Sequence, residues 1–76
     1  MSEHVVIDTL GFACPIPVIR LAKAAETSPG GTIIEVLSDD PGAKVDIPVW
    51  CRMKRHEFLG REDRDRGWAF RVRVAG

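Results

Sequence analysis

The chain has 76 residues, so it can form a single domain (1–76) with one small hydrophobic core. Hydrophobic residues make up 45% of the sequence and charged residues 29%, a balance typical of a globular protein and not of a disordered one. No apolar run approaches the ~20 residues that span a bilayer. The start, Met1-Ser2-Glu3-His4, is neither basic nor hydrophobic in the manner of a signal peptide. We therefore expect a cytoplasmic protein with no membrane anchor.

Charge is unevenly distributed along the chain, although the formal net charge is zero. Residues 1–50 carry three basic and seven acidic side chains, and residues 51–76 carry eight basic and four acidic ones, so the two parts hold −4 and +4. In a domain this small the split favours a polarised surface suited to docking a partner. The alternative is that the two parts intermix in space and the asymmetry cancels.

The first half of the chain predicts a strand, a helix and a second strand. A strand from His4 to Thr9 precedes a turn at Leu10-Gly11, after which apolar residues fall at helical spacing up to about Glu26. The expected buried side of this helix consists of Val18, Leu21, Ala22 and Ala25. The segment Ser28-Pro29-Gly30-Gly31 ends it. Residues 32–37 are β-branched and nearly all apolar, which predicts a central strand covered on both faces and parallel to the first.

The second half predicts another helix and a hairpin. Because Pro48 interrupts the helical pattern, we expect this helix to begin near Asp46, with a buried stripe of Val49, Trp50 and Met53. The hairpin pairs residues 58–62 with residues 68–74, and its second arm alternates strictly between apolar and other positions. The core-facing side chains of that arm are Trp68, Phe70, Val72 and Val74. The order β-α-β-α-β-β predicts an α+β fold, a two-layer α/β sandwich in which two helices cover one face of a four-stranded mixed sheet.

The most informative stretch, Phe12-Ala13-Cys14-Pro15-Ile16-Pro17, places a cysteine at the start of the first helix. Proline is tolerated in the first helical turn because the N–H groups there have no intrahelical partner. With Cys14 as N-cap, Pro15 takes the first helical position and Pro17 the third, and the remaining free N–H groups lie beside the sulfur. We expect this position to lower the pKa of the thiol, as a sulfur nucleophile requires. The alternative is a cysteine that packs as a small hydrophobic residue.

The second cysteine, Cys51, is expected on the second helix, beyond the reach of Cys14 and packed as a small side chain. Two cysteines in a reducing compartment do not predict a structural disulfide, and this pair is too distant in sequence for a C-x-x-C motif. The cysteines, His4 and His56 lack zinc-site spacing. We therefore expect no metal and no cofactor.

Four sequence features together resemble the TusA/SirA-like sulfur-carrier family over roughly Ile7 to Val74. They are Gly11, Cys14-Pro15-Ile16-Pro17, Asp39-Asp40-Pro41 and Asp46-Ile47-Pro48. The resemblance implies that Cys14 carries sulfur as a persulfide and that Pro15 and Pro17 are the motif prolines. It also implies a sulfurtransferase-type carrier, not a stand-alone catalyst, which takes sulfane sulfur from a cysteine desulfurase or a rhodanese-like donor and passes it to an acceptor protein.

In the family branch that serves tRNA thiolation, the residue before the cysteine is often Arg and the residue between the prolines often Glu. Ala13 and Ile16 stand there in this chain. The resemblance therefore leaves tRNA thiolation, sulfur oxidation and molybdenum-cofactor biosynthesis open as pathways.

Candidate docking residues surround the motif. Phe12 and Ile16 form a short hydrophobic collar, typical of transient complexes of a monomer. Arg20 and Lys23 face outward, where they are either solvated or guide an acidic partner.

Two other functions stay open: a cysteine-independent regulatory or interaction module, and a small RNA-binding domain that uses the basic second half. Arg61, Arg71 and Arg73 could line the open face of the sheet. Nucleic-acid platforms, however, stack bases on exposed aromatic residues, and Trp68 and Phe70 are expected on the opposite side. Direct nucleic-acid binding is therefore not expected.

Overall fold

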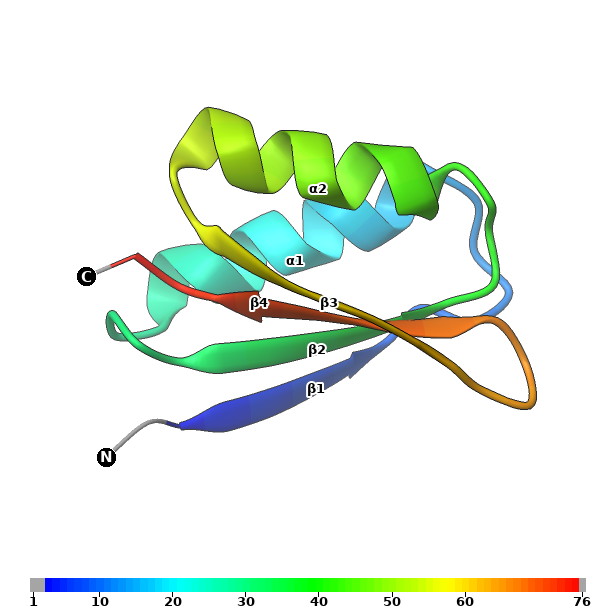
Figure 1. Cartoon of the computed structure of the whole chain (residues 1–76), viewed down its shortest axis with the longest axis horizontal. Coiled ribbons are helices and arrows are strands. Elements are labelled where there is room, and N and C mark those ends of the chain that lie inside the picture. Colours follow the sequence, from blue (N-terminus) through cyan, green and yellow to red (C-terminus); the bar gives the residue numbers. More distant parts are fainter. Residues whose placement is uncertain (1–2, 76) are drawn as a thin grey trace.

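A four-stranded mixed sheet with two helices on one face forms the molecule (Figure 1). The computed structural model describes residues 3–75. The elements are β1 (His4–Asp8), α1 (Ile16–Thr27), β2 (Ile33–Ser38), α2 (Ala43–Lys54), β3 (Glu57–Asp63) and β4 (Trp68–Arg73). The predicted α+β fold class and the order β-α-β-α-β-β are thus confirmed. Within the described residues, neither helix is long and apolar enough to cross a membrane.

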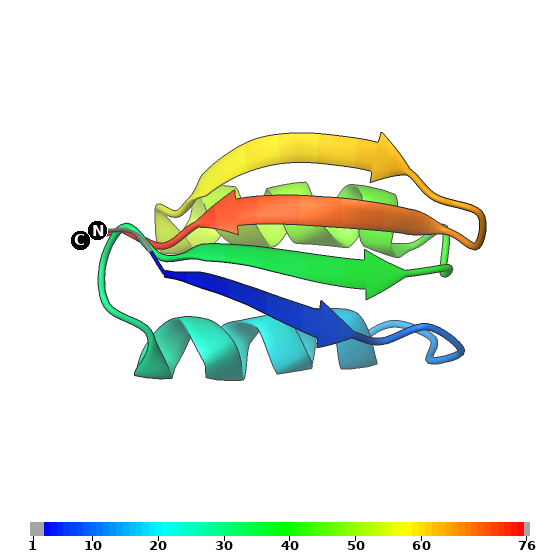
Figure 2. The same ribbon diagram turned by 90° about the horizontal axis from the view of Figure 1, so that it is seen from below.

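The strand order across the sheet is β1-β2-β4-β3 (Figure 2). β1 and β2 pair in parallel, as predicted, and β4 runs antiparallel to both β2 and β3. Because β1 and β2 are parallel neighbours, the loops that follow them leave the same edge of the sheet. These two loops lead into α1 and α2, so the first turns of both helices lie at that edge (Figure 1).

The core lies between the helices and the sheet. Leu21 and Ala25 of α1 are buried, as are Phe70 and Val72 of β4, so the predicted faces of these two elements are confirmed. Ile34 and Val36 of β2 complete the apolar layer beneath the helices. Period-two alternation in the strands and helical spacing in α1 therefore direct the same set of side chains inward.

The prediction that the second strand is covered on both faces is confirmed, but side chains and not helices cover the face opposite α1 and α2. There Glu35 is only 8% exposed because arginines cover it. Arg71 donates from Nε to Glu35 Oε1 at 3.0 Å, and Arg64 approaches the same oxygen at 3.5 Å. Arg73 on this face pairs with Glu57 at 2.7 Å. Ion pairs, not a second layer of helices, close this side of β2.

The predicted start of the second helix is wrong, and of its predicted buried stripe only Trp50 packs against the core. α2 begins at Ala43 and continues through Pro48, and its buried side chains are Ala43, Ile47 and Cys51. Val49 is half exposed and Met53 is 71% exposed. The helix carries two apolar stripes at i, i+4, i+8 spacing on opposite sides: 43-47-51 and 45-49-53. The second is more hydrophobic, but the first is the one that packs in the core, with the small residues Ala43 and Cys51 on either side of Ile47.

Candidate functional site

Cys14 lies in the loop between β1 and α1, two residues before the helix begins. The prediction that Cys14 is the N-cap is wrong: α1 starts at Ile16, Pro15 occupies the cap position, and Pro17 is the second helical residue. The cause is a turn ahead of the helix, in which the Ile16 N–H donates to the Ala13 carbonyl oxygen at 3.1 Å. Cys14 is therefore part of that turn, and its thiol is free and partly exposed.

The loop before α2 forms the other wall of the site. The Cys14 N–H donates to Asp40 Oδ2 at 2.8 Å. Gly42, the cap residue of α2, lies so close that a Cβ placed on it would be 3.5 Å from Cys14 Sγ and 3.0 Å from Asp40 Oδ2. The sulfur thus lies beside the first turn of α2 as well as that of α1. A Cβ at position 42 would be in ordinary contact with the sulfur but tight against the Asp40 carboxylate, so glycine eases the packing of this loop.

Asp39 fixes the beginning of the same loop. Its Oδ1 accepts the Gly11 N–H at 3.1 Å, and its Oδ2 accepts Arg66 Nε at 2.8 Å. The Gly11 N–H, followed by the Arg66 guanidinium, lowers the pKa of the Asp39 carboxyl. The loop that carries Cys14 is therefore attached through Asp39 to the turn between β3 and β4.

The expected lowering of the thiol pKa is wrong in sign. Burial, followed by interaction with the carboxylates of Asp40 and Asp46, raises the pKa of Cys14 from 9.0 to about 12. The helix amides offset little of this. Pro15 and Pro17 have no N–H, and the Ile16 N–H is already bonded to Ala13. At neutral pH the thiol is therefore protonated.

Comparison with known proteins assigns the chain to a family. The family model of Sulfurtransferase TusA matches residues 5–74, nearly the whole chain. The chain belongs to the TusA family. This confirms the family that the Cys-Pro-Ile-Pro motif and the two aspartate segments indicated.

Individual relatives agree with this family assignment. The chain is 38% identical over 63 residues to the "Putative sulfur carrier protein YrkI" of Bacillus subtilis, covering 83% of this chain and 84% of that protein. A "Putative sulfur carrier protein" of Archaeoglobus fulgidus is 47% identical over 53 residues, covering 70% of this chain and 69% of the relative. "Putative sulfur carrier protein YrkF" of B. subtilis is 32% identical over 62 residues, covering 82% of this chain. The match spans only 34% of the length of YrkF.

The fold of the family is also confirmed by a solved structure. The crystal structure of the SirA-like protein from Desulfitobacterium hafniense superposes with a TM-score of 0.78 and 33% sequence identity, covering 95% of this chain and 97% of that one.

Three of the four predicted docking residues are exposed. Phe12 is 48% exposed, and the Arg20 guanidinium lies over its ring, 5.7 Å from the ring centre. Ile16 is partly buried, and Lys23 is exposed on α1. Of these four residues only Phe12 lines a shallow hollow of about 290 Å³, together with Gly11, Ala13, Asp39 and Asp40. A partner that reaches into this hollow would meet Phe12 at its rim.

Three residues at the site, Asp40, Gly42 and Asp46, were not among the predicted functional residues. The family motifs contained both aspartates, but nothing in their spacing placed them at the thiol. A signal was present in the topology. Parallel neighbouring strands end at one edge of a sheet, so the loops after β1 and β2 must lie side by side. This argument predicts contact between the Cys14 loop and the Asp39-Asp40 loop.

Cys51 lies on α2, as predicted, and is buried with only 1% exposed. It follows Gly42 by nine residues, which is roughly 13 Å along a helix axis. Gly42 is the α2 residue beside Cys14 Sγ, so Cys51 is separated from Cys14 by about this distance along the α2 axis. Both are free.

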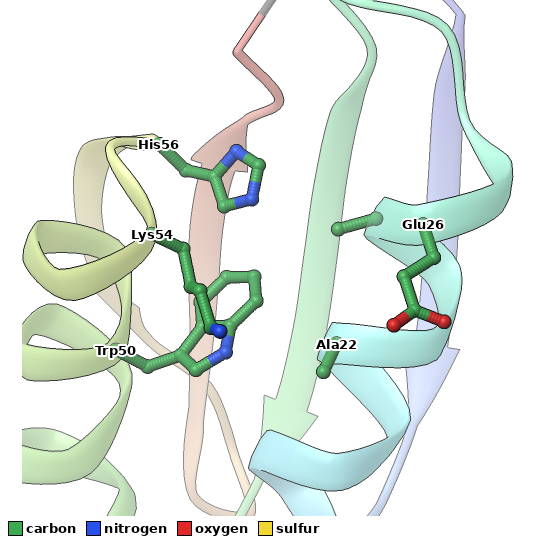
Figure 3. Close-up of a pocket in the computed structure, with 6 residues that line it drawn as sticks. Ala22, Glu26, Trp50, Lys54 and His56 are labelled. Carbon is green, nitrogen blue, oxygen red and sulfur yellow. The ribbon is translucent and has the colours of Figure 1, made fainter.

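A second hollow, of about 310 Å³, separates the C-terminal halves of α1 and α2 (Figure 3). Trp50 and Lys54 line one side of it, and Ala22 and Glu26 line the other. His56 stacks on Trp50 with ring centres 4.9 Å apart, and its Nδ1 accepts the Ala75 N–H at 2.9 Å. These residues attach the end of the chain to the helix layer, away from Cys14. Among residues 3–75, no group of three or more potential ligands could hold a metal ion.

Proposed function

We propose that this protein is a sulfur carrier that accepts sulfane sulfur as a persulfide on Cys14 and passes it to an acceptor protein. The observation that carries this proposal is a free, partly exposed thiol within the Cys-Pro-Ile-Pro motif of a TusA-family fold. The preceding residue, Ala13, and Asp40, which accepts the Cys14 N–H, line a shallow hollow beside it. The names of the relatives support the same activity.

The reaction consists of two displacements. In the first, Cys14 Sγ attacks the outer sulfur of a donor persulfide. The Sγ–S bond forms, the donor S–S bond breaks, and the donor leaves as a thiol. In the second, an acceptor thiolate attacks the outer sulfur on Cys14, which returns to a thiol. Both steps follow the chemistry of thiol–disulfide exchange and need no outside oxidant or reductant.

The proposal also covers the partners of the protein and where it acts. The donor is a cysteine desulfurase or a rhodanese-like protein, and the acceptor serves tRNA thiolation, sulfur oxidation or cofactor biosynthesis. Phe12, Ile16, Arg20 and Lys23 dock these proteins in turn. The protein acts in the cytoplasm as a monomer that forms transient complexes.

Intact-mass spectrometry tests the proposal. The protein is incubated with a cysteine desulfurase and cysteine, and its mass is measured before and after reduction. We expect the addition of one sulfur atom, removed by reductant, in the wild type and in Cys51→Ala. Cys14→Ser should remain unloaded with an unchanged circular dichroism spectrum. A repeat with a rhodanese-like donor covers the other donor class. Loading of Cys14→Ser, or no loading of the wild type by either donor, would contradict the proposal.

A further inference from the structure

The turn between β3 and β4, residues 64–67, lies at the same end of the molecule as the loops that follow β1 and β2 (Figure 1, Figure 2). The Arg64 N–H donates to the Gly67 carbonyl oxygen at 3.1 Å, which closes the turn. Gly67 packs so closely that a Cβ placed on it would overlap the backbone of Ser38 and Asp39. The turn therefore rests directly on the end of β2 and the loop after it.

Arg66 adds a charged contact between this turn and the same loop. Its Nε donates to Asp39 Oδ2 at 2.8 Å, and among residues 3–75 no other cation pairs with Asp39. The other carboxylate oxygen, Oδ1, accepts the Gly11 N–H at 3.1 Å. The guanidinium also lies close to Gly11 itself, because a Cβ placed there would be 3.4 Å from Arg66 Nη2. One carboxylate thus connects the turn to the loop that follows β1.

That loop is attached to β2 and the segment after it at three points. At its start, the Thr9 N–H donates to a carbonyl oxygen of β2 at 2.9 Å. At its end, the Cys14 N–H donates to Asp40 Oδ2 at 2.8 Å. The bond between Gly11 and Asp39 lies between these two and also reaches the β3–β4 turn. The middle attachment is therefore the one that a side chain of the turn supports.

Gly11 is the most adaptable backbone position in the loop. Its φ is 86°, a conformation that glycine adopts readily along with many others. Residues 12–14 follow it directly, so the direction in which the thiol is presented depends on what holds Gly11. Asp39 holds its N–H, and Arg66 holds Asp39.

We propose that Arg66 is a positioning residue for sulfur transfer: by pairing with Asp39 it fixes Gly11, and with it the orientation in which Cys14 meets the persulfide of a docked donor. This inference rests on the proposed function. Displacement at sulfur requires the two reacting atoms to be aligned, so a loop held in one orientation reacts faster with a donor that is itself held in place. Arg66 takes no part in the bond changes themselves.

Arg66→Gln tests the role in transfer. It removes the charge and should slow loading from a cysteine desulfurase about fivefold, which corresponds to the upper range for an exposed ion pair. Alkylation of Cys14 by iodoacetamide should be nearly unchanged, because a small reagent approaches from any open direction. Arg66→Lys, which keeps a cation within reach of Asp39, should recover most of the loading rate.

Arg73→Gln is the matched control. It removes an exposed arginine from an ion pair of similar length, 2.7 Å to Glu57, at the end of β4 far from the turn. We expect this variant to load at the wild-type rate. Equal slowing by Arg66→Gln and Arg73→Gln would overturn a specific role for Arg66.

Asp39→Asn separates positioning from direct contact between Arg66 and the donor. The variant keeps an oxygen for the Gly11 N–H, loses the ion pair and leaves the guanidinium free for a partner. We expect it to slow loading as Arg66→Gln does, and the double variant should be no slower than either single one, because both changes break the same contact. Unchanged loading in Asp39→Asn, or losses that multiply in the double variant, would overturn action through Asp39.

Amide signals in NMR spectra report on the loop without any sulfur chemistry. In Arg66→Gln we expect the signals of residues 11–14 to shift and the Gly11 N–H to exchange faster with solvent, whereas Arg73→Gln should leave them in place. Unmoved signals in Arg66→Gln would overturn the positioning role. If the wild type accepts no sulfur from any donor, the proposed function fails, while the amide signals still decide whether Arg66 fixes the loop.

Discussion

The backbone N–H of Cys14 and the carboxylate of Asp40 are joined by a 2.8 Å hydrogen bond across 26 residues of sequence. The preceding residue, Asp39, accepts the Gly11 N–H at 3.1 Å. Two consecutive carboxylates at the end of β2 thus fix the loop that follows β1. The position and the acidity of the thiol are set by a loop that is distant in sequence, and substitutions there should alter Cys14 without contacting a partner.

Asp40→Asn should make the Cys14 thiol more acidic. The Asp40 carboxylate disfavours the thiolate and so raises the pKa of Cys14, and an amide in its place keeps an oxygen for the Cys14 N–H but loses the charge. We expect the pH midpoint of Cys14 alkylation to move below that of the wild type. Asp40→Ala, which also loses the acceptor, should in addition broaden the NMR signals of residues 11–14. An upward shift in Asp40→Asn would contradict this account.

Alkaline pH should destabilise the wild type more than Cys14→Ser. The folded-state pKa of Cys14 is raised from 9.0 to about 12, so the neutral thiol stabilises the fold fully below pH 9, and this contribution is lost as the pH rises towards 12. Urea unfolding at pH 7 and above pH 10 measures the difference. Cys51 is present in both proteins, so its contribution to the pH dependence of stability cancels in the comparison. An equal loss of stability in both would mean that the thiol titrates alike in the folded and unfolded chains.

Gly67→Ala should be clearly more destabilising than Gly31→Ala. Both glycines have positive φ, 73° and 90°, so alanine is strained at each by ~1–2 kcal/mol. A Cβ at Gly67 would also overlap the carbonyl oxygen of Ser38, whereas a Cβ at Gly31 meets no atom within 4 Å. The overlap should cost a further ~2 kcal/mol and displace the Asp39-Asp40 loop. Chemical denaturation compares the two, and similar losses of stability would contradict the predicted overlap.

Much of the fold could be predicted from the sequence because local pattern and tertiary structure agree. The alternation in β4 and the helical spacing in α1 identified side chains such as Phe70 and Leu21 that are indeed buried. The prediction of the buried face of α2 failed for a physical reason. Its two apolar stripes are opposite, and only contact with the sheet selects the one that contains Ile47. Local periodicity cannot make that choice.

The site was predicted less completely than the fold. Cys14 is identified by its motif, but its acidity depends first on burial and then on Asp40 and Asp46, and the parallel pairing of β1 and β2 brings the Asp40 loop to it. Rules for helix ends describe only local charge, and they predicted a shift of the wrong sign. Tertiary neighbours outweigh the helix terminus here.

Phe12→Asp should slow transfer from a protein donor roughly tenfold, or about 1.4 kcal/mol, because it places a charge at the proposed docking rim. Transfer from a small persulfide should be nearly unchanged. Val6→Asp is the matched control: Val6 is 57% exposed, comparable with Phe12 at 48%, but lies on the sheet face opposite the helices. Competition kinetics with the two donors measure both rates. Equal slowing by the two variants would contradict a specific docking role for Phe12.

Cys51→Ala should leave sulfur loading unchanged and destabilise the protein by about 1 kcal/mol, because a small buried group is removed from a packed helix face. If Cys51 could reach loaded Cys14, its thiol would attack Sγ, close a disulfide and expel sulfide. Its burial and its position about two and a half turns beyond Gly42 on α2 prevent this attack. Loaded wild-type protein kept without reductant should therefore retain its extra sulfur for as long as loaded Cys51→Ala. Release of sulfide from the wild type alone, with an internal disulfide in the digest, would show that the two cysteines meet and that this chain cannot hold sulfur for a partner.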